Sequence, residues 1–367
     1  MKNIINNILD FKGGEKFYRF GNADGKYWIM PARGMRTAMN LYQPSGIKGK
    51  MLRTLLPYLH SIPLIRNVIH AQTLHCRLNK ELEKLLCDLF GTEELEFGIF
   101  EGTPSVHKKV TMQLSNGKKI LGYCKLSNSD EIKKLFEKES VILKSLAEKG
   151  IRNIPNAMYC GTLDNGTHIF VQSTVKTASS QNIHKFGHMH EDFLSQLHKK
   201  TRQRVLFEES DCFRTLETLE NHLNWLPDNI DEGIILKAIS DIRKRYCGCE
   251  VEFSAYHGDF TPWNMFVEKK ELFVFDFEYA GMSYPKGLDR YHFFTQTAIF
   301  EKNWGADDIT AFIENGNCKW IDKLLYKIYL LDMVSRFTIR EHGKVNGEAA
   351  KPFELWGKIL ESIMADN

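Results

Sequence analysis

The chain between residues 96 and 175 shows the apolar spacing of β-strands. Val110, Met112 and Leu114 alternate with polar residues and lead into Ser-Asn-Gly, a strong signal for a two-strand turn. Only one long segment in this region has helical spacing. Several strands and one helix in this order predict a small α+β lobe, because helices would alternate with every strand in a doubly wound sheet. The expected strands cover residues 110–114, 119–126, 154–160 and 168–172, and the expected helix covers residues 130–149.

After residue 176, apolar residues recur mainly at helical spacing. Phe213, Leu216, Leu219 and Leu223, for example, fall on one stripe of an expected helix. A short strand-rich island interrupts the helices. The pattern therefore predicts a large, mainly helical lobe. The expected helices cover residues 193–200, 213–226, 233–246 and 320–341, and the expected strands of the island cover residues 251–255 and 271–276.

The first 95 residues form a third region, which we expect to be mostly helical. Residues 17–20 and 26–30 flank a turn-rich stretch and predict a short hairpin. Helical spacing follows, and Pro57 is expected to end or kink the first of these helices. The expected helices cover residues 47–59, 63–78 and 80–90. We therefore predict three domains: an N-terminal extension over residues 1–95, a small lobe over residues 96–175 and a large lobe over residues 176–367.

The composition indicates a globular protein that we expect to be cytoplasmic. With 367 residues and 43% hydrophobic content, the chain can bury the cores of two or three domains. No segment approaches the roughly 18 consecutive apolar residues of a membrane span, and the start lacks the apolar core of a secretory signal. The eight cysteines show no CxxC pairs, so reduced thiols are expected. The pair Cys247 and Cys249 lacks the second pair that a zinc site needs.

Charge is distributed unevenly along the chain. Residues 25–80 contain nine lysines and arginines and no aspartate or glutamate, although the whole chain carries only +3. This basic segment predicts an anionic partner, for which a phosphate-rich ligand, a membrane surface and a nucleic acid are the alternatives. Nucleic acid ranks last, because no DNA- or RNA-binding motif is recognisable there. A further alternative is that these side chains face water or pair with the more acidic remainder of the chain.

The densest chemistry lies in the strand-rich island, which has the sequence HGDFTPWNMFVEKKELFVFDFEYA. Asp259 and Asn264 occur in a loop after one strand, and Asp276 ends the next apolar strand. Phosphoryl transfer requires that the two substrates are positioned, that Mg²⁺ neutralises the phosphate charge, and that a carboxylate orients the acceptor hydroxyl. Mg²⁺ prefers oxygen ligands, which Asn264 and Asp276 offer. Asp259 then remains to accept the hydroxyl proton.

At these residues the sequence resembles the aminoglycoside phosphotransferase and choline kinase superfamily, in which an HGDxxxxN loop precedes a strand that ends in Asp. The resemblance covers about residues 96–290 and implies a two-lobed protein-kinase-like fold that binds ATP and Mg²⁺. It implies that Asp259 is the catalytic base, that Asn264 and Asp276 bind Mg²⁺, and that His257 stabilises the loop. The alternative is a polar turn followed by an unrelated strand-end carboxylate.

The expected small lobe supplies a second pair of candidates. Lys125 lies inside an expected strand, and Glu139 follows on the expected helix. A strand lysine paired with a helix glutamate holds the nucleotide phosphates in kinase-like folds. Glu137 is the rival partner, and the alternative for Lys125 and Glu139 is a pair of solvated surface charges.

Two further groups of candidates rest on their position in the chain. The segment 98–105 takes the place of a phosphate-covering loop, with Gly98, Gly102 and Ser105 as its candidates, although it is not a GxGxxG sequence and a plain hairpin turn is equally compatible. Glu101 would repel phosphate if it pointed inward. The resemblance places the adenine near Gln172, Ser173 and Thr174.

Departures from protein kinases favour a small acceptor. Asp276-Phe277-Glu278 stands where protein kinases have Asp-Phe-Gly, and the APE segment is missing. The family resemblance also matches Asp289 to an aspartate that holds the large lobe, which implies a structural role for it. We expect transfer to a hydroxyl of a small molecule, a glycan or a lipid-linked sugar, with a nucleotide-binding regulator of little turnover as the alternative. A choline acceptor would need an aromatic cage, for which the large lobe has several candidate residues. The alternative is that these aromatic residues fill a core. The candidates for the cage are Trp263, Tyr279, Tyr284, Tyr291, Trp304 and Trp320.

Overall fold

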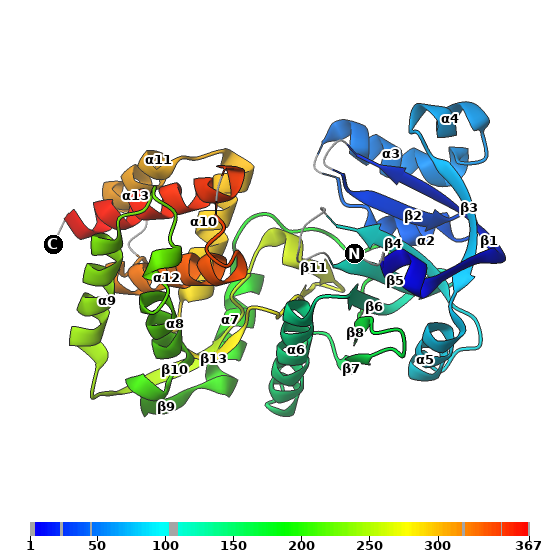
Figure 1. Cartoon of the computed structure of the whole chain (residues 1–367). Coiled ribbons are helices and arrows are strands. Elements are labelled where there is room, and N and C mark those ends of the chain that lie inside the picture. Colours follow the sequence, from blue (N-terminus) through cyan, green and yellow to red (C-terminus); the bar gives the residue numbers. More distant parts are fainter. Residues whose placement is uncertain are drawn as a thin grey trace. The chain divides into compact units, whose positions relative to one another are not determined.

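The computed structural model describes residues 4–22, 25–44, 46–102, 109–317, 320–345 and 347–365. The chain divides into two compact units (Figure 1). The first comprises Met1–Glu148, Arg152–Gln181 and Val267–Glu278, and the second comprises Lys149–Ile151, Asn182–Phe266 and Tyr279–Asn367. A bilayer crossing needs a helix of about 20 mostly apolar residues, and none of the helices within the described residues meets this requirement.

The first unit is built on an eight-stranded antiparallel sheet with the order β3-β1-β2-β4-β5-β6-β8-β7. The predicted Ser-Asn-Gly turn joins β5 to β6, where Asn116 pairs with Lys119. The strands are β1 (Leu9–Gly21), β2 (Tyr27–Pro31), β3 (Gln72–Leu78), β4 (Glu96–Glu101), β5 (Val110–Asn116), β6 (Lys119–Ser127), β7 (Ala157–Thr162) and β8 (His168–Ser173).

The N-terminal extension differs from the expected mostly helical segment, because three of its segments are strands of this sheet. The predicted hairpin is β1 and β2, and β2 continues into the small lobe by pairing with β4. Residues 72–78, expected to end a helix, form β3, and the helix before them ends at Val68. Leu74, Cys76 and Leu78 recur at a spacing of two, which suits a strand with one buried face. The extension is therefore continuous with the small-lobe sheet.

Both faces of the N-terminal strands are covered. Phe17 and Ile29 face a core that also contains Leu82 and Leu86, whereas Tyr18 and Met30 face a second core that contains Leu56. Burial on two sides explains why β2 is a nearly continuous apolar run. The helices of this unit are α1 (Ile4–Ile8), α2 (Met35–Ala38), α3 (Ile47–Leu59), α4 (Pro63–Val68), α5 (Lys80–Phe90) and α6 (Asp130–Glu148).

The second unit is mainly helical, as the spacing predicts. Its core gathers apolar residues from α8, α9, α10, α12 and α13, with Tyr326 and Tyr329 fully buried at its centre. The helix expected over residues 213–226 ends earlier, at Glu220, and a 3₁₀ turn follows at Leu223–Trp225. The helices are α7 (His188–Thr201), α8 (Asp211–Glu220), α9 (Glu232–Tyr246), α10 (Leu288–Lys302), α11 (Ala306–Phe312), α12 (Lys323–Arg340) and α13 (Lys351–Ala365).

Short strands carry the motif residues. A three-stranded sheet of order β13-β10-β9 lies in the second unit, and β11 and β12 form a two-stranded sheet. The loop with Asp259 follows β10, and Asp276 follows β12. These strands are β9 (Gln203–Leu206), β10 (Glu250–Tyr256), β11 (Met265–Glu268), β12 (Glu271–Val274) and β13 (Gly281–Tyr284).

Candidate active site

A buried ion pair joins the sheet of the first unit to its long helix. Lys125 on β6 donates to both carboxylate oxygens of Glu139 on α6, with Nζ to oxygen distances of 3.0 and 2.8 Å. The Glu139 side chain is completely buried, whereas the rival candidate Glu137 is exposed. The structure therefore pairs Lys125 with Glu139, because only Glu139 lies on the face of α6 that packs against the sheet.

Asp276 is the second partner of Lys125. The Lys125 Nζ donates to Asp276 Oδ1 at 2.6 Å, and the next residue, Phe277, donates its backbone N–H to Glu139 Oε1 at 3.2 Å. Asp276 has a φ of 71°, a left-handed conformation that Asp adopts more readily than most residues other than glycine. The backbone turns at Asp276, directly after β12, and the Asp276 carboxylate contacts Lys125 on β6.

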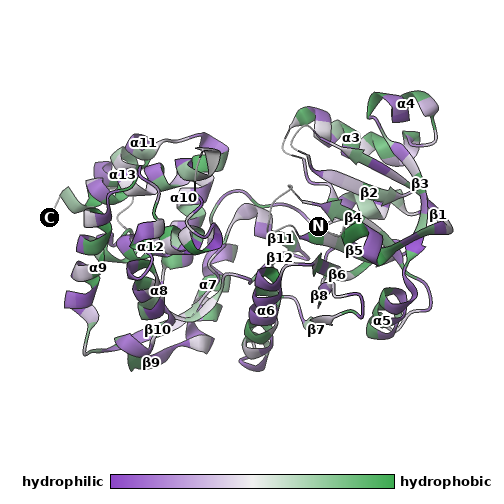
Figure 2. Ribbon diagram, viewed as in Figure 1, coloured by the Kyte–Doolittle hydropathy of each residue, from purple (hydrophilic) through white to green (hydrophobic). Residues whose placement is uncertain are grey.

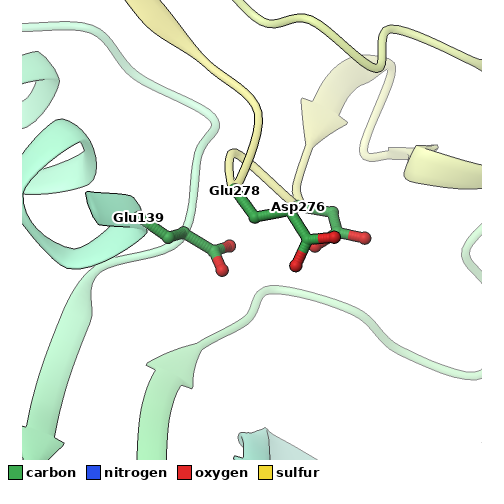
Figure 3. Close-up of side chains that lie close together, drawn as sticks. All are labelled: Glu139, Asp276 and Glu278. Carbon is green, nitrogen blue, oxygen red and sulfur yellow. The ribbon is translucent and has the colours of Figure 1, made fainter. Parts of the chain in front are cut away.

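Three carboxylates gather at this point. Glu139, Asp276 and Glu278 offer oxygen atoms that lie within 4.8 Å of one another (Figure 3). Glu278 is buried and pairs with Lys109. Burial acts to lower the pKa of Lys125, but Asp276 and Glu139 outweigh it and raise that pKa above its usual value. The Lys125 ammonium is therefore charged.

The same cluster fits a divalent cation. Burial raises the pKa of Glu139 above its ordinary value, and Asp276 and Glu278 raise it further against the opposing effect of Lys125. Three carboxylates facing the ammonium groups of Lys125 and Lys109 leave an excess of one negative charge when all are ionised. A cation would relieve the repulsion between the carboxylates, and hard oxygen donors are the ligands that Mg²⁺ prefers.

In the second unit, Asp259 is held through both of its carboxylate oxygens. Asn264 Nδ2 donates to Oδ2 at 2.7 Å, and His292 Nε2 lies 2.9 Å from Oδ1. Asn264 Nδ2 also donates to the backbone carbonyl of Asp259 at 3.0 Å. These bonds use the amide nitrogen of Asn264, so its amide oxygen remains as the atom that can bind a cation. The Asp259 side chain keeps 27% of its surface exposed, enough for an acceptor to reach it.

The loop before Asp259 is fixed by buried polar groups. The backbone N–H groups of His257 and Gly258 donate to the Asp289 carboxylate at 3.0 and 3.1 Å, as suits the structural role expected for Asp289. Burial raises the pKa of Asp289 to about 7, and these two donors oppose the shift. Arg336 donates to the carbonyl oxygen of Gly258. His257 is fully buried, and its Nδ1 accepts from the N–H of Asp259 at 3.1 Å, which suits a role in holding the loop.

Glycine is required at position 258. Its φ is 80°, and a Cβ there would meet the carbonyl oxygen of Tyr279 at 2.6 Å. A side chain at this position would therefore displace the loop that carries Asp259.

The proposed phosphate-covering loop is corrected in part. Gly98 lies inside β4, where it pairs with Gln113, and a Cβ there would meet Ala38 Cβ at 3.1 Å and Met30 Sδ at 3.3 Å. The absence of a side chain at Gly98 lets Ala38 of α2 and Met30 of β2 pack against β4, and a contact of Gly98 with phosphate stays a prediction. Gly102 directly follows β4, and Ser105 lies outside the described residues. Glu101 is buried and pairs with Arg19, with Nε to Oε1 at 3.3 Å.

The residues expected near the adenine lie at the end of β8. Gln172 is buried within the sheet, where its backbone pairs with that of Tyr123. Ser173 accepts a hydrogen bond from the N–H of Asn156 at 2.9 Å, and Thr174 accepts one from the N–H of Lys176 at 3.2 Å. Both hydroxyl groups stabilise the chain after β8, so adenine recognition here stays a prediction that would rest on backbone groups.

Sequence reasoning missed three side chains of the site. His292 contacts Asp259, Arg336 contacts the Gly258 carbonyl, and Lys109 pairs with Glu278. One signal was present for His292, because it lies three residues after Asp289 and therefore near the same face of α10. Arg336 and Lys109 are far from their partners in sequence, and no local spacing indicates them.

Residues 174–285 match the family model described as "phosphotransferase enzyme family", and this range contains Asp259, Asn264 and Asp276. The predicted resemblance to the phosphotransferase superfamily is confirmed. No curated protein matches the chain.

The chain is similar in structure to solved phosphotransferases, and the match with a TM-score of 0.50 supports a shared fold. A thermostable mutant of aminoglycoside phosphotransferase APH(4)-Ia, in a ternary complex with AMP-PNP and hygromycin B, is 11% identical with a TM-score of 0.50, covering 78% of this chain and 99% of that chain. LicA in complex with AMP is 13% identical with a TM-score of 0.48, covering 79% and 100%. A putative fructosamine-3-kinase from Haemophilus somnus 129PT is 11% identical with a TM-score of 0.45, covering 78% and 97%. The predicted α+β, protein-kinase-like fold is confirmed.

Replacing Lys125 with alanine should weaken MgATP binding by about tenfold or more, because a charge-assisted contact to the phosphates would be lost. The dissociation constant for MgATP measures the effect, and Lys118→Ala at the exposed β5–β6 turn is the control. Because Glu139 would lose its buried cation, at a cost of about 3–5 kcal/mol, the melting temperature is measured alongside. A folded variant with unchanged affinity and a lower kcat would contradict this assignment.

Proposed function

We propose that the protein is an ATP-dependent phosphotransferase that moves the γ-phosphate to a hydroxyl group of a small molecule, a glycan or a lipid-linked sugar. The proposal rests on the orientation of the Asp259 carboxylate, whose two oxygens contact Asn264 and His292. The loop that carries Asp259 is in turn held by Asp289. A carboxylate held in this way can accept a proton from an acceptor hydroxyl without first reorganising.

The first unit would bind the nucleotide. Lys125, fixed by Glu139, would contact the α- and β-phosphates, as strand lysines do in kinase-like folds. Asp276, together with the amide oxygen of Asn264, would hold Mg²⁺, which when bound neutralises phosphate charge. Since Asp276 also contacts Lys125, its carboxylate would bring the cation and the lysine to the same end of the nucleotide.

Asp259 would act on the acceptor. Its exposed edge would accept the hydroxyl proton as the oxygen attacks the γ-phosphate, while Asn264 and His292 keep the carboxylate in place. The protein contributes position and charge, which is most of what phosphoryl transfer requires.

The aromatic residues considered for a choline cage are divided by the structure. Tyr284 and Tyr291 are buried in the core of the second unit, and Tyr284 exchanges a hydrogen bond with Thr215 at 2.6 Å. Trp263, by contrast, is 41% exposed and lies in the loop between Asp259 and Asn264. A cage built from all these rings is therefore not available, whereas Trp263 can contact an acceptor.

The proposal is tested by measuring ATP turnover with a panel of sugars, amino alcohols and aminoglycosides, with the phosphorylated position located by mass spectrometry. We expect transfer to a hydroxyl of one class of acceptor. If the protein binds nucleotide but transfers phosphate to no acceptor, and if Asp259→Asn does not change the rate of ATP turnover, the result would favour a nucleotide-binding regulator instead.

Replacing His292 with leucine should lower kcat by about tenfold, because one hydrogen bond to the base is worth about 1–2 kcal/mol. The KM for ATP should stay near its original value, since His292 contacts Asp259 alone among the proposed site residues within the described part of the chain. His292→Gln offers an N–H donor at a similar reach and should recover most of the rate. If kcat falls equally in both variants, His292 contributes through packing and not through its hydrogen bond to Asp259.

A further inference from the structure

The helices α3 and α4 carry an unusual amount of exposed apolar surface. Fourteen large hydrophobic residues are exposed among the described residues, and half of them fall between residues 47 and 68. Figure 2 shows apolar segments on both helices. Soluble surfaces carry scattered apolar residues, whereas a concentration of this kind marks a surface that meets another apolar phase. The seven residues are Ile47, Met51, Leu55, Tyr58, Ile62, Leu64 and Val68, and we call them the α3–α4 face.

On α3 these side chains form a single stripe. At 100° per residue, the positions of Ile47, Met51, Leu55 and Tyr58 fall within about 80° of one another. Lys48 lies about 20° beyond one edge of this stripe, and Lys50 lies about 60° beyond the other. Long basic side chains beside an apolar stripe can keep their charges in the headgroup layer while their stems cover apolar surface.

The opposite side of α3 already has its partner. Leu56 is buried and Leu52 partly buried in the core that contains Tyr18, Trp28 and Met30. The helix is thus apolar on two sides, and only one of them is needed to hold it against the sheet. The side chains of Ile47, Met51, Leu55 and Tyr58 on the outward side are 46–78% exposed, and this exposed apolar area does not contribute to the stability of the fold.

Charge selects the kind of partner. The segment 25–80 has nine lysines and arginines and no acidic residue, and α3 itself contributes Lys48, Lys50 and Arg53. Two copies of this face would bring like charges together, which opposes self-association. A nucleic acid would attract the charges but would leave the apolar stripe in water. An anionic bilayer can bind both the basic side chains and the apolar stripe, because its headgroups contact the lysines and its acyl chains contact the stripe.

We propose that the α3–α4 face binds the surface of a membrane that contains anionic lipids, with α3 lying in the plane of the interface. This inference goes beyond the proposed phosphotransferase function and does not depend on it. It places the protein at a lipid surface without any membrane-spanning helix among the described residues.

The test is co-sedimentation of the full chain with vesicles of phosphatidylcholine that contain or lack phosphatidylserine. Wild-type protein should bind the anionic vesicles and bind neutral ones at least about tenfold more weakly. The triple variant Met51→Ser, Leu55→Ser and Tyr58→Ser should lose at least about tenfold in binding. Its fold should survive, since Met51 and Tyr58 are more than half exposed and Leu55 is 46% exposed.

Matched controls separate the two contributions. Val141→Ser with Leu236→Ser removes exposed apolar groups elsewhere and should leave binding unchanged. Lys48→Gln with Lys50→Gln should weaken binding most at low salt, whereas Lys118→Gln with Lys119→Gln should have little effect. Failure of wild-type protein to bind anionic vesicles, or equal binding to neutral ones, would overturn the proposal. A dimer that the triple variant dissolves would overturn it in favour of a second copy of the chain.

Discussion

Replacing Asp259 with asparagine should slow phosphate transfer at least about a hundredfold while MgATP still binds. The amide keeps the size of the carboxylate and can still contact Asn264 and His292, so the loop fixed by Asp289 should persist. What is lost is the ability to accept the acceptor proton. Single-turnover rates and the dissociation constant for MgATP, measured on the same preparation, separate chemistry from binding.

An exposed aspartate of the same unit gives the control for this variant. Asp228→Asn removes the same charge away from the loop and should leave both quantities unchanged. If nucleotide affinity collapses in Asp259→Asn while the control binds normally, Asp259 is a ligand or a structural group and not the base.

Replacing Asp276 with asparagine should abolish measurable transfer with little loss of folding. The change removes a carboxylate proposed to bind Mg²⁺, and this carboxylate also accepts a hydrogen bond from Lys125, as Glu139 does. The Asp276 side chain is 29% exposed, so the cost to the fold should be small compared with the loss of Glu139. Activity is measured as Mg²⁺ is titrated, and the melting temperature reports on folding.

A titration with excess Mg²⁺ shows whether Asp276 is a metal ligand. A weakened metal site should regain part of its activity as the Mg²⁺ concentration rises, whereas the exposed control Asp164→Asn should titrate like the wild type. Near-wild-type activity of Asp276→Asn at ordinary Mg²⁺ would rule out the proposed metal role.

The parts of the fold with local signals could be predicted from the sequence. The Ser-Asn-Gly turn, the helix α6 and the hairpin of β1 and β2 depend on neighbours within a few residues, and each is present. The place of β3 beside β1 could not be predicted, because this pairing joins Leu9 to Leu78 and nothing nearby specifies it. The short helix α4 and the alternation after it were consequently merged into one helix.

The candidate site divides in the same way. Asp259, Asn264 and Asp276 occur at a fixed spacing within one island, whereas the family resemblance favours Glu139 over Glu137 because Glu139 lies four residues before Leu143. His292 and Arg336 reach the loop from α10 and α12, so their roles depend on helix packing that the sequence pattern leaves open. Gly98 lies within β4 and not in the expected loop, because a glycine that lets a helix pack closely on a strand looks, in sequence, like one required by a loop.

The division of the chain into units bears on the order in which the protein can be completed during translation. The first unit includes Val267–Glu278, which the ribosome adds only after the long segment Asn182–Phe266 of the second unit. Lys125 and Glu139 therefore leave the ribosome well before Asp276, and the nascent sheet lacks one of its charges until then. A stalled or truncated product that ends before residue 276 would carry all eight strands of the main sheet without the aspartate proposed to bind the metal. If Asp276 binds Mg²⁺ as proposed, the metal site can form only after residue 276 has been synthesised, although Lys125 and Glu139 are already present.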